Sequence, residues 1–315
     1  MPQACPSCIY KPNSKNKNIQ LMKLRNLLMC LLLVGGLSTS CIKEDHSDCY
    51  NIYCLALSYF GDGDTDIFPE KIDRVHLYVF DQNNNCVTAT QLSDADVEAQ
   101  LTTLPPLEEG EYRIVCVGNA YDTKVQNLDS KDLSKVSFAA ADYVNGEEVS
   151  GNDPLYWSAI DYTIAPYDEK KQIETQTTYF SSSHYDISVE IVGVEAVKSA
   201  GYPDVKLVAV SPYTDFNNRV FGDAVTYVME TSHDGGNTLL ATNNIMRHQN
   251  HEDVQLVLQA GENILATVNF AEHIKKYNIN TTLEECVIPF KVEFTTANAI
   301  VTVPDWFVHK VDPEF

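Results

Sequence analysis

The cysteine at position 41 is the side chain whose surroundings most clearly predict a chemical reaction. Lys23 and Arg25 precede an apolar run at residues 27–37, and small residues lead from that run to Cys41. This order is typical of a secretory leader, whose apolar stretch is too short to cross a bilayer as a helix. In a bacterial lipoprotein leader the cysteine thiol is acylated, and the peptide is cut just before it. We therefore expect a covalent lipid such as palmitate at Cys41 and no other cofactor.

One position in this leader departs from the usual lipoprotein pattern. Ser38 stands three residues before the cysteine, where Leu or a similar residue is standard. The alternative is an ordinary signal peptide that is cut near Ser40 and leaves Cys41 as a free thiol. The order of the apolar run, the small residues and the cysteine favours the lipoprotein.

The charged residues after the cysteine indicate a destination. Lys43, Glu44 and Asp45 resemble the export signal that sends lipoproteins of Bacteroidetes to the outer face of the outer membrane. We expect a lipid-anchored protein at the cell outer membrane, exposed on the surface. Residues 1–40 form the expected leader, with Met22 as an alternative start, and residues 41–49 form the expected lipidated tether.

The chain is strongly acidic. It has 22 Lys and Arg against 44 Asp and Glu, a net charge of −22. The first 40 residues hold five of the basic residues and none of the acidic ones, so their removal leaves 17 against 44, or −27. Such a surface repels nucleic acid and anionic lipid headgroups. We expect no nucleic-acid partner, and membrane contact through acyl chains, where each buried methylene contributes about 0.8 kcal/mol.

Cysteine number limits the possible disulfides. If Cys41 is lipidated, an odd number remains, so at least one cysteine is unpaired within the chain. Cys116 lies in an apolar strand pattern and is expected to be a small buried hydrophobe. Cys49 and Cys54 could bond to each other or to Cys86, and both alternatives stay open. The remaining cysteines are Cys49, Cys54, Cys86, Cys116 and Cys286.

Alternate aspartates form a weak candidate metal site. Asp62, Asp64 and Asp66 have the spacing of positions 1, 3 and 5 of a calcium loop. Ile67 and Asp73 stand where that loop needs Gly and Glu, so a solvated hairpin loop is the preferred interpretation. We expect no metal.

Catalytic motifs are lacking. His248 and His251 lie close to two carboxylates, but the segment adjoins a strand and lacks the His-Glu-x-x-His order of a zinc site, which favours a polar loop. The sequence contains no Gly-x-Ser-x-Gly elbow, P-loop or dinucleotide fingerprint. We expect no catalytic residue and no enzyme.

Hydrophobic alternation predicts an all-β fold. Pro289 lies inside one predicted strand and indicates an edge or a strand start, because proline donates no ladder hydrogen bond. Short helices are expected at residues 93–101, with Ser93 as N-cap, and at residues 270–277. About 275 mature residues suggest two domains, which we place at residues 50–181 and 182–315. The expected strands cover residues 75–80, 112–117, 173–180, 187–191, 205–210, 225–229, 254–258, 288–294 and 299–303.

A family resemblance extends over nearly all of the mature chain. The segment from Cys41 to Cys49 is similar to the lipidated start of the FimB-type (FimB/Mfa-like) fimbrial anchor lipoproteins of Bacteroidetes. Residues 72–81 (IDRVHLYVFD) resemble the first strong strand of that family, and residues 107–112 (LEEGEY) with 117–119 (VGN) resemble its next hairpin. The short helix at 271–277, the strand at 287–294 and residues 300–306 (IVTVPDW) resemble its C-terminal part.

This resemblance implies two transthyretin-like β-sandwiches in tandem. It also implies a non-enzymatic role at the base of a type V-like fimbria, where the anchor holds the shaft to the outer membrane and limits its assembly or length. The implied partners are fimbrial shaft or accessory subunits, bound through β-strands at a sheet edge or groove. The alternative is a surface glycan-binding lipoprotein of a polysaccharide-uptake system, which needs an exposed platform of aromatic side chains.

Overall fold

The computed structural model describes residues 51–166, 173–197, 202–233, 236–248, 250–295 and 298–307. Strands dominate these residues and the helices are short, which confirms the predicted all-β class. The described residues 52–165 and those from 173 onward belong to one compact unit. In these ranges, no helix has the length and apolar character that are needed to span a membrane.

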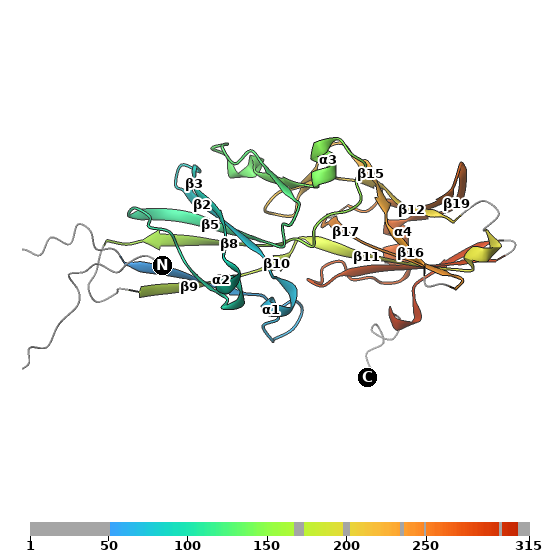
Figure 1. Cartoon of the computed structure of the whole chain (residues 1–315), viewed down its shortest axis with the longest axis horizontal. Coiled ribbons are helices and arrows are strands. Elements are labelled where there is room, and N and C mark those ends of the chain that lie inside the picture. Colours follow the sequence, from blue (N-terminus) through green and yellow to red (C-terminus); the bar gives the residue numbers. More distant parts are fainter. Residues whose placement is uncertain are drawn as a thin grey trace, which may run out of the picture. The chain divides into compact units, whose positions relative to one another are not determined.

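Two facing sheets enclose the first hydrophobic core (Figure 1). The smaller sheet has the order β4-β1-β9, and the larger has the order β10-β8-β5-β2-β3. Leu55, Val79, Ile114 and Tyr162 come from both sheets and are buried against one another. The strands are β1 (Ile52–Ser58), β2 (Val75–Asp81), β3 (Cys86–Gln91), β4 (Leu101–Thr103), β5 (Gly110–Gly118), β8 (Tyr156–Ile164), β9 (Ile173–Tyr179) and β10 (Ser181–Ser182).

A second pair of sheets encloses another core. Their orders are β16-β17-β11-β20-β21 and β15-β12-β18-β19. Ile187, Leu207, Leu256 and Phe290 are fully or almost fully buried in this core. The strands are β11 (His184–Val192), β12 (Asp204–Val210), β15 (Val225–Met229), β16 (Thr231–His233), β17 (Thr238–Met246), β18 (Gln255–Ala260), β19 (Asn263–Asn269), β20 (Val287–Phe294) and β21 (Ala299–Thr302).

A small fifth sheet combines distant parts of the sequence. Its order is β14-β13-β7-β6, from β6 (Lys124–Gln126), β7 (Ser137–Ala139), β13 (Tyr213–Thr214) and β14 (Val220–Phe221). A third cluster with Phe138 and Phe216 packs beside it. This sheet joins strands from both sides of residue 182, so the position of the domain boundary stays a prediction, as does the transthyretin-like detail.

Each sandwich contains one parallel strand pair that joins segments far apart in the sequence. β1 pairs with β9 from Ile52 opposite Ile173 to Ser58 opposite Tyr179, without a register shift. β11 pairs in parallel with β20 in the second sandwich. Parallel neighbours need a long crossover connection, which sequence alternation alone does not reveal.

The helices form where the capping residues predict them. In α2 (Asp94–Glu98) the Ser93 side chain accepts the N–H of Asp96 at 3.2 Å. The helix is shorter than predicted because Gln100 adopts a left-handed conformation, with φ of 52°. α4 (Phe270–Lys276) forms as expected, with Asn269 as its N-cap. The other short helices are α1 (Phe68–Lys71), α3 (Ala141–Asn145), η2 (Leu133–Lys135) and η3 (Val194–Ala196).

The position of Pro289 agrees with its missing donor. β20 lies between β11 and β21, but β21 pairs only with Lys291 to Phe294. At Pro289 the strand therefore has a neighbour on the β11 side alone, opposite Ser188. Proline thus stands where the strand is locally an edge.

Candidate functional site: a sheet edge and an acidic cavity

The residues predicted to carry the lipid and the export signal lie outside the described residues. These are Cys41, Lys43, Glu44 and Asp45. Their roles therefore stay predictions. Cys49 is outside the described ranges as well.

The three candidate calcium ligands have separate surroundings. Asp62 accepts the N–H groups of Glu284 and Glu285 at 2.8 and 3.0 Å. Burial raises the pKa of Asp66, but hydrogen bonds from Ser58 and from backbone N–H groups outweigh it and bring this pKa below its usual value. Asp64 is exposed. In the described part of the chain, no three His, Cys, Asp or Glu side chains are grouped to hold a metal ion.

In the predicted polar loop at residues 248–253, His248 is buried and His251 is half-buried, whereas Asn250, Glu252 and Asp253 are exposed. His248 is 6% exposed, and its Nδ1 donates to the carbonyl of Met246 at 3.0 Å. Its ring lies 4.5 Å from that of His251 and packs on Tyr185. Burial lowers the pKa of both histidines, to about 4 for His251. The lowered pKa values favour the neutral form of both rings.

The described cysteines are free thiols. Cys54, Cys116 and Cys286 are buried, and Cys86 is partly exposed. Cys54 and Cys86 therefore do not form the disulfide that the sequence left open. Cys116 is 1% exposed, which confirms that it is a small buried hydrophobe, and burial raises its pKa to about 12.

A half-buried carboxylate, that of Glu285, joins several segments. Glu285 accepts the hydroxyl hydrogens of Tyr59 at 2.5 Å and Tyr156 at 3.3 Å, and it pairs with Lys71. Burial raises the pKa of Glu285, but the hydrogen bonds from Lys71 and Tyr59 outweigh it, so the net shift is downward. Glu284 accepts the N–H of Ser182 at 2.5 Å. No local sequence pattern distinguishes these two acids from the other acidic residues of the chain.

The free edge at β9 is the most regular long edge in the described part of the molecule. β3 and β19 are also edge strands, but a register shift interrupts the pairing of each with its neighbour. Such irregularities discourage the addition of another strand. β9 has seven uninterrupted pairs with β1. Ile173 and Tyr179 on its outer face are 66% and 63% exposed.

The inner face of β9 is polar. Glu174 and Gln176 are half-buried there, and the hydroxyl of Thr178 is buried without a hydrogen-bond partner among the described residues. An inward-pointing charge is a known protection of an edge strand against uncontrolled pairing. β9 therefore combines a regular backbone edge with a side-chain pattern that limits random association.

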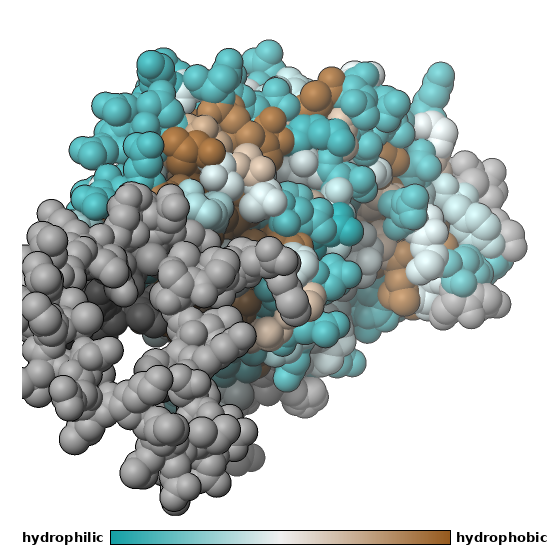
Figure 2. Space-filling view, turned by 60° about the vertical axis from the view of Figure 1, so that its left-hand side comes forward, coloured by the Kyte–Doolittle hydropathy of each residue, from teal (hydrophilic) through white to brown (hydrophobic). Residues whose placement is uncertain are grey.

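Figure 2 shows small hydrophobic patches among hydrophilic residues on one face of the molecule. Phe221 stacks on Tyr213 with ring centroids 5.4 Å apart and an interplanar angle of 6°. Phe221 is 42% exposed and Trp306 is 46% exposed. Trp157 packs against the third core cluster.

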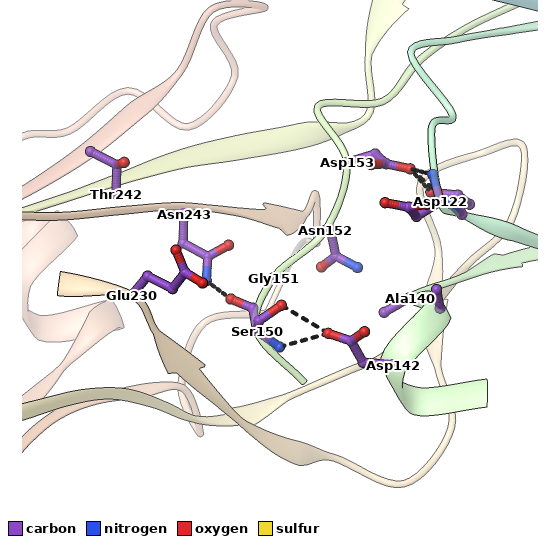
Figure 3. A pocket seen from close by; sticks show the side chains of 12 residues that line it. Asp122, Ala140, Asp142, Ser150, Gly151, Asn152, Asp153, Glu230, Thr242 and Asn243 are labelled. Carbon is purple, nitrogen blue, oxygen red and sulfur yellow. Dashed lines mark hydrogen bonds between the residues drawn. The ribbon is translucent and has the colours of Figure 1, made fainter. Parts of the chain in front are cut away.

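An acidic cavity of about 270 Å³ lies between the segment at residues 150–153, the start of α3, the middle of β17 and the residues that follow β5 and β15 (Figure 3). Asp142 accepts the N–H and hydroxyl of Ser150 at 3.1 and 2.8 Å. Asn243 donates to the carbonyl of Ser150 at 2.5 Å. Sequence reasoning missed this cavity because its residues are far apart in the chain. They are Asp122, Thr123, Ala140, Ala141, Asp142, Ser150, Gly151, Asn152, Asp153, Glu230, Thr242 and Asn243.

These features define a β-sandwich protein with a regular free sheet edge at β9. A family model described as fimbrillin-A associated anchor proteins Mfa1 and Mfa2 matches residues 46–312. The chain belongs to this family of fimbrial anchor proteins, as the sequence resemblance predicted. The family and the fold indicate a structural protein of the cell envelope with a fimbrial anchor or adhesin role.

Solved structures share the fold at low sequence identity. The fimbrial anchor protein Mfa2 from Porphyromonas gingivalis has a TM-score of 0.60 at 14% identity, over 81% of this chain and 96% of its own. A proposed adhesin from Bacteroides ovatus has a TM-score of 0.64 at 15% identity, over 82% and 95%. A proposed polysaccharide-binding protein from Bacteroides thetaiotaomicron has a TM-score of 0.63 at 13% identity, over 81% and 96%. No curated protein matches the chain.

Proposed function

We propose that this chain is an outer-membrane lipoprotein that anchors the base of a type V-like fimbria and limits its assembly. Membership of the anchor family supports the fimbrial role. The leader that ends at Cys41 supports the lipid anchor, and Lys43, Glu44 and Asp45 support export to the cell surface. Acyl chains on one sulfur hold a protein at a membrane without a spanning helix.

The observation that carries the binding proposal is the regular free edge of β9. A fimbrial subunit that adds a strand there gains main-chain hydrogen bonds along seven residues. The exposed side chains of Ile173 and Tyr179 supply apolar contacts to the added strand or its neighbours. Fimbrial shaft or accessory subunits are the proposed partners.

Alternate residues of β9 direct their backbone N–H groups to opposite sides, and this alternation identifies the groups that an added strand would use. The N–H of Phe180 bonds to the carbonyl of Ser58, so even-numbered residues of β9 direct their N–H groups toward β1. The odd-numbered residues, including Thr177, direct theirs outward. A proline at position 177 therefore removes an outward donor and leaves the pairing with β1 in place.

The test compares two proline variants of the full-length protein. Thr177→Pro should lower the recovery of fimbrial subunits with the anchor by about tenfold, while the thermal midpoint stays close to that of the parent. Ala89→Pro on β3 is the matched control. The N–H of Leu92 donates to the carbonyl of Val75, so even-numbered residues of β3 direct their N–H groups toward β2 and odd-numbered residues direct theirs outward. Equal recovery with both variants would reject β9 as the binding edge.

Two cellular experiments test anchoring itself. Deletion of the gene should release fibres or change their length, and fibres that stay attached at normal length would contradict the proposal. Cys41→Ala should move the protein out of the membrane fraction. Unchanged partitioning would reject lipidation at this cysteine.

The glycan-binding alternative has less support. It requires a platform of several exposed aromatic rings on one surface, whereas the ring pairs with an exposed member are small: Phe221 on Tyr213, and Phe60 beside Tyr179 with ring centroids 6.2 Å apart. The structural neighbour that is described as a proposed polysaccharide-binding protein shares the fold at 13% identity. The anchor function is therefore our conclusion.

A further inference from the structure

The outer face of the β4-β1-β9 sheet carries no charged side chain. Tyr53, Leu55 and Leu57 of β1 point into the first core, so the alternate residues of β1 and the residues paired with them point outward. These outward residues are Ile52, Cys54, Ala56 and Ser58 of β1, Ile173, Thr175, Thr177 and Tyr179 of β9, and Leu101 and Thr103 of β4. None is Asp, Glu, Lys, Arg or His, whereas Asp, Glu, Lys and Arg make up 21% of the whole chain.

Large hydrophobic side chains are exposed along the whole length of this face. Ile52 is 41% exposed and lies opposite the exposed Ile173 at the end where β1 begins. Leu101, which is 43% exposed, lies beside the middle of β1. At the far end, the ring of Phe60 lies beside that of Tyr179, with centroids 6.2 Å apart. A group of exposed apolar side chains indicates an interaction surface, whereas single ones do not.

The polar groups on this face are hydroxyls rather than ions. Thr103, Thr175 and Thr177 are exposed, and a hydroxyl can exchange water for another polar partner. Ser58 is buried, and its hydroxyl donates to Asp66 at 2.6 Å, so this carboxylate is already hydrogen-bonded at the border of the face. Contact with an apolar or interfacial surface therefore requires no ion on the face to leave water.

The entry of the chain into β1 places one end of this face close to the proposed lipid. Residues 42–51 are all that separate Cys41 from Ile52. An extended chain covers about 3.3–3.6 Å per residue, so Ile52 stays within about 40 Å of Cys41. The connecting residues include Lys43, Glu44 and Asp45, and such charged residues are poorly suited to cover an apolar face themselves.

We propose that the outer face of the β4-β1-β9 sheet lies against the lipid bilayer and so orients the protein on the membrane. This inference rests on the proposed lipid anchor. The exposed Ile and Leu side chains leave water on contact, and the ring and hydroxyl of Tyr179 suit the boundary between acyl chains and headgroups. A weak affinity is sufficient, because a short tether gives an effective concentration on the order of mM.

This contact leaves the edge of β9 accessible. The backbone N–H and C=O groups of an edge strand point within the plane of the sheet, whereas the side chains of the face project perpendicular to that plane. A fimbrial subunit could therefore add a strand to β9 while the face contacts the bilayer. A partner protein that covers the face instead is the alternative that the test distinguishes.

The test uses the full mature chain, residues 41–315, on phosphatidylcholine vesicles. An N-terminal hexahistidine segment and a nickel-chelating lipid hold the Cys41→Ala chain there, so the tether does not require natural lipidation. Tyr179→Trp places a fluorescent probe on the face, and Gln91→Trp places one at an exposed position of β3 in the other sheet. The emission of the parent, from Trp157 and Trp306, is subtracted from both.

Brominated phosphatidylcholine, which quenches tryptophan at the bilayer, gives the readout. The added emission of Tyr179→Trp should be quenched in these vesicles and shifted to shorter wavelength, whereas that of Gln91→Trp should match its value in ordinary vesicles. Absence of quenching in Tyr179→Trp, or equal quenching in both variants, would overturn the proposal. Because the tether is artificial, this outcome is independent of the fractionation test of Cys41.

A charge on the face tests the same contact. Ile173→Glu, combined with Tyr179→Trp, should abolish the quenching, because a carboxylate must leave water for the face to stay on the bilayer. Ile173 is 66% exposed, so the thermal midpoint should change little. Val87→Glu on β3, at a position that is 48% exposed, is the matched control and should leave the quenching intact. If Ile173→Glu lowers the recovery of fimbrial subunits but leaves the quenching unchanged, the face binds a protein and the membrane proposal is wrong.

Discussion

Replacement of Glu285 by alanine tests whether one carboxylate stabilises the junction of several segments. In the parent, Glu285 accepts hydrogen bonds from the hydroxyls of Tyr59 and Tyr156 and pairs with Lys71. Tyr59 is 1% exposed and Tyr156 is 3% exposed. The variant leaves both hydroxyls buried without this acceptor.

The expected cost follows from these contacts. A buried donor that loses its partner costs about 1–3 kcal/mol. Lys71 is partly exposed, with 37% of its side chain accessible, so the loss of its ion pair adds little. The two hydroxyls together predict a loss of about 3 kcal/mol for Glu285→Ala. In a chain of this size that corresponds to a drop of about 6–12 °C in the thermal midpoint.

Calorimetry on matched variants measures the effect. Glu285→Gln keeps an acceptor oxygen and should cost less than Glu285→Ala. Tyr59→Phe removes one donor, and its combination with Glu285→Ala should be less destabilising than the two single effects added together. Asp161→Ala breaks the exposed pair with Arg113 and should cost less than about 1 kcal/mol. If Glu285→Ala lowers the midpoint no more than Asp161→Ala, the hydrogen-bonding argument is refuted.

Three further predictions concern backbone, titration and core. Gly193→Ala should destabilise the protein by about 2–4 kcal/mol in chemical unfolding, because φ is +80° and a Cβ would collide with the carbonyl of Phe294; a normal midpoint would contradict this. Stability should fall as pH drops from about 6.5 toward 4, because unfolded His251 binds a proton at its usual pKa of 6.5 while the folded pKa is about 4. His251→Phe should flatten that part of the pH profile, and an unchanged profile would assign the acid sensitivity elsewhere. Phe290→Ala, at a fully buried position, should cost about 3–5 kcal/mol in the same unfolding assay, and a cost under about 1 kcal/mol would show that the core closes around the gap.

Hydrophobic alternation identified the strands that have one buried face. Residues 187–191 and 288–294 alternate cleanly, and they form the central parts of β11 and β20. β17 was not predicted, because Asn243 and Asn244 interrupt its apolar pattern. β1 was missed for the opposite reason, since a nearly continuous apolar run has no period that separates strand from buried helix.

Features that depend on contacts between distant residues could not be predicted from the sequence. The parallel pairing of β1 with β9 joins residues more than one hundred positions apart, and neither strand contains a local signal for its partner. The cavity likewise draws Asp122, Asn152 and Glu230 from separate connections. A leader that ends at Cys41 could be predicted because targeting signals are read as local sequence, and it stays a prediction, whereas binding surfaces depend on the folded chain.

If the chain is anchored through Cys41 as proposed, the placement of β1 has a mechanical consequence. This strand lies between β4 and β9, and the chain enters it at Ile52 from the side of the proposed lipid at Cys41. When a pull along the strand axis reaches Ile52, the hydrogen bonds to both neighbours bear the force together and must shear at once. A strand at the border of its sheet would instead peel away one bond at a time, at much lower force.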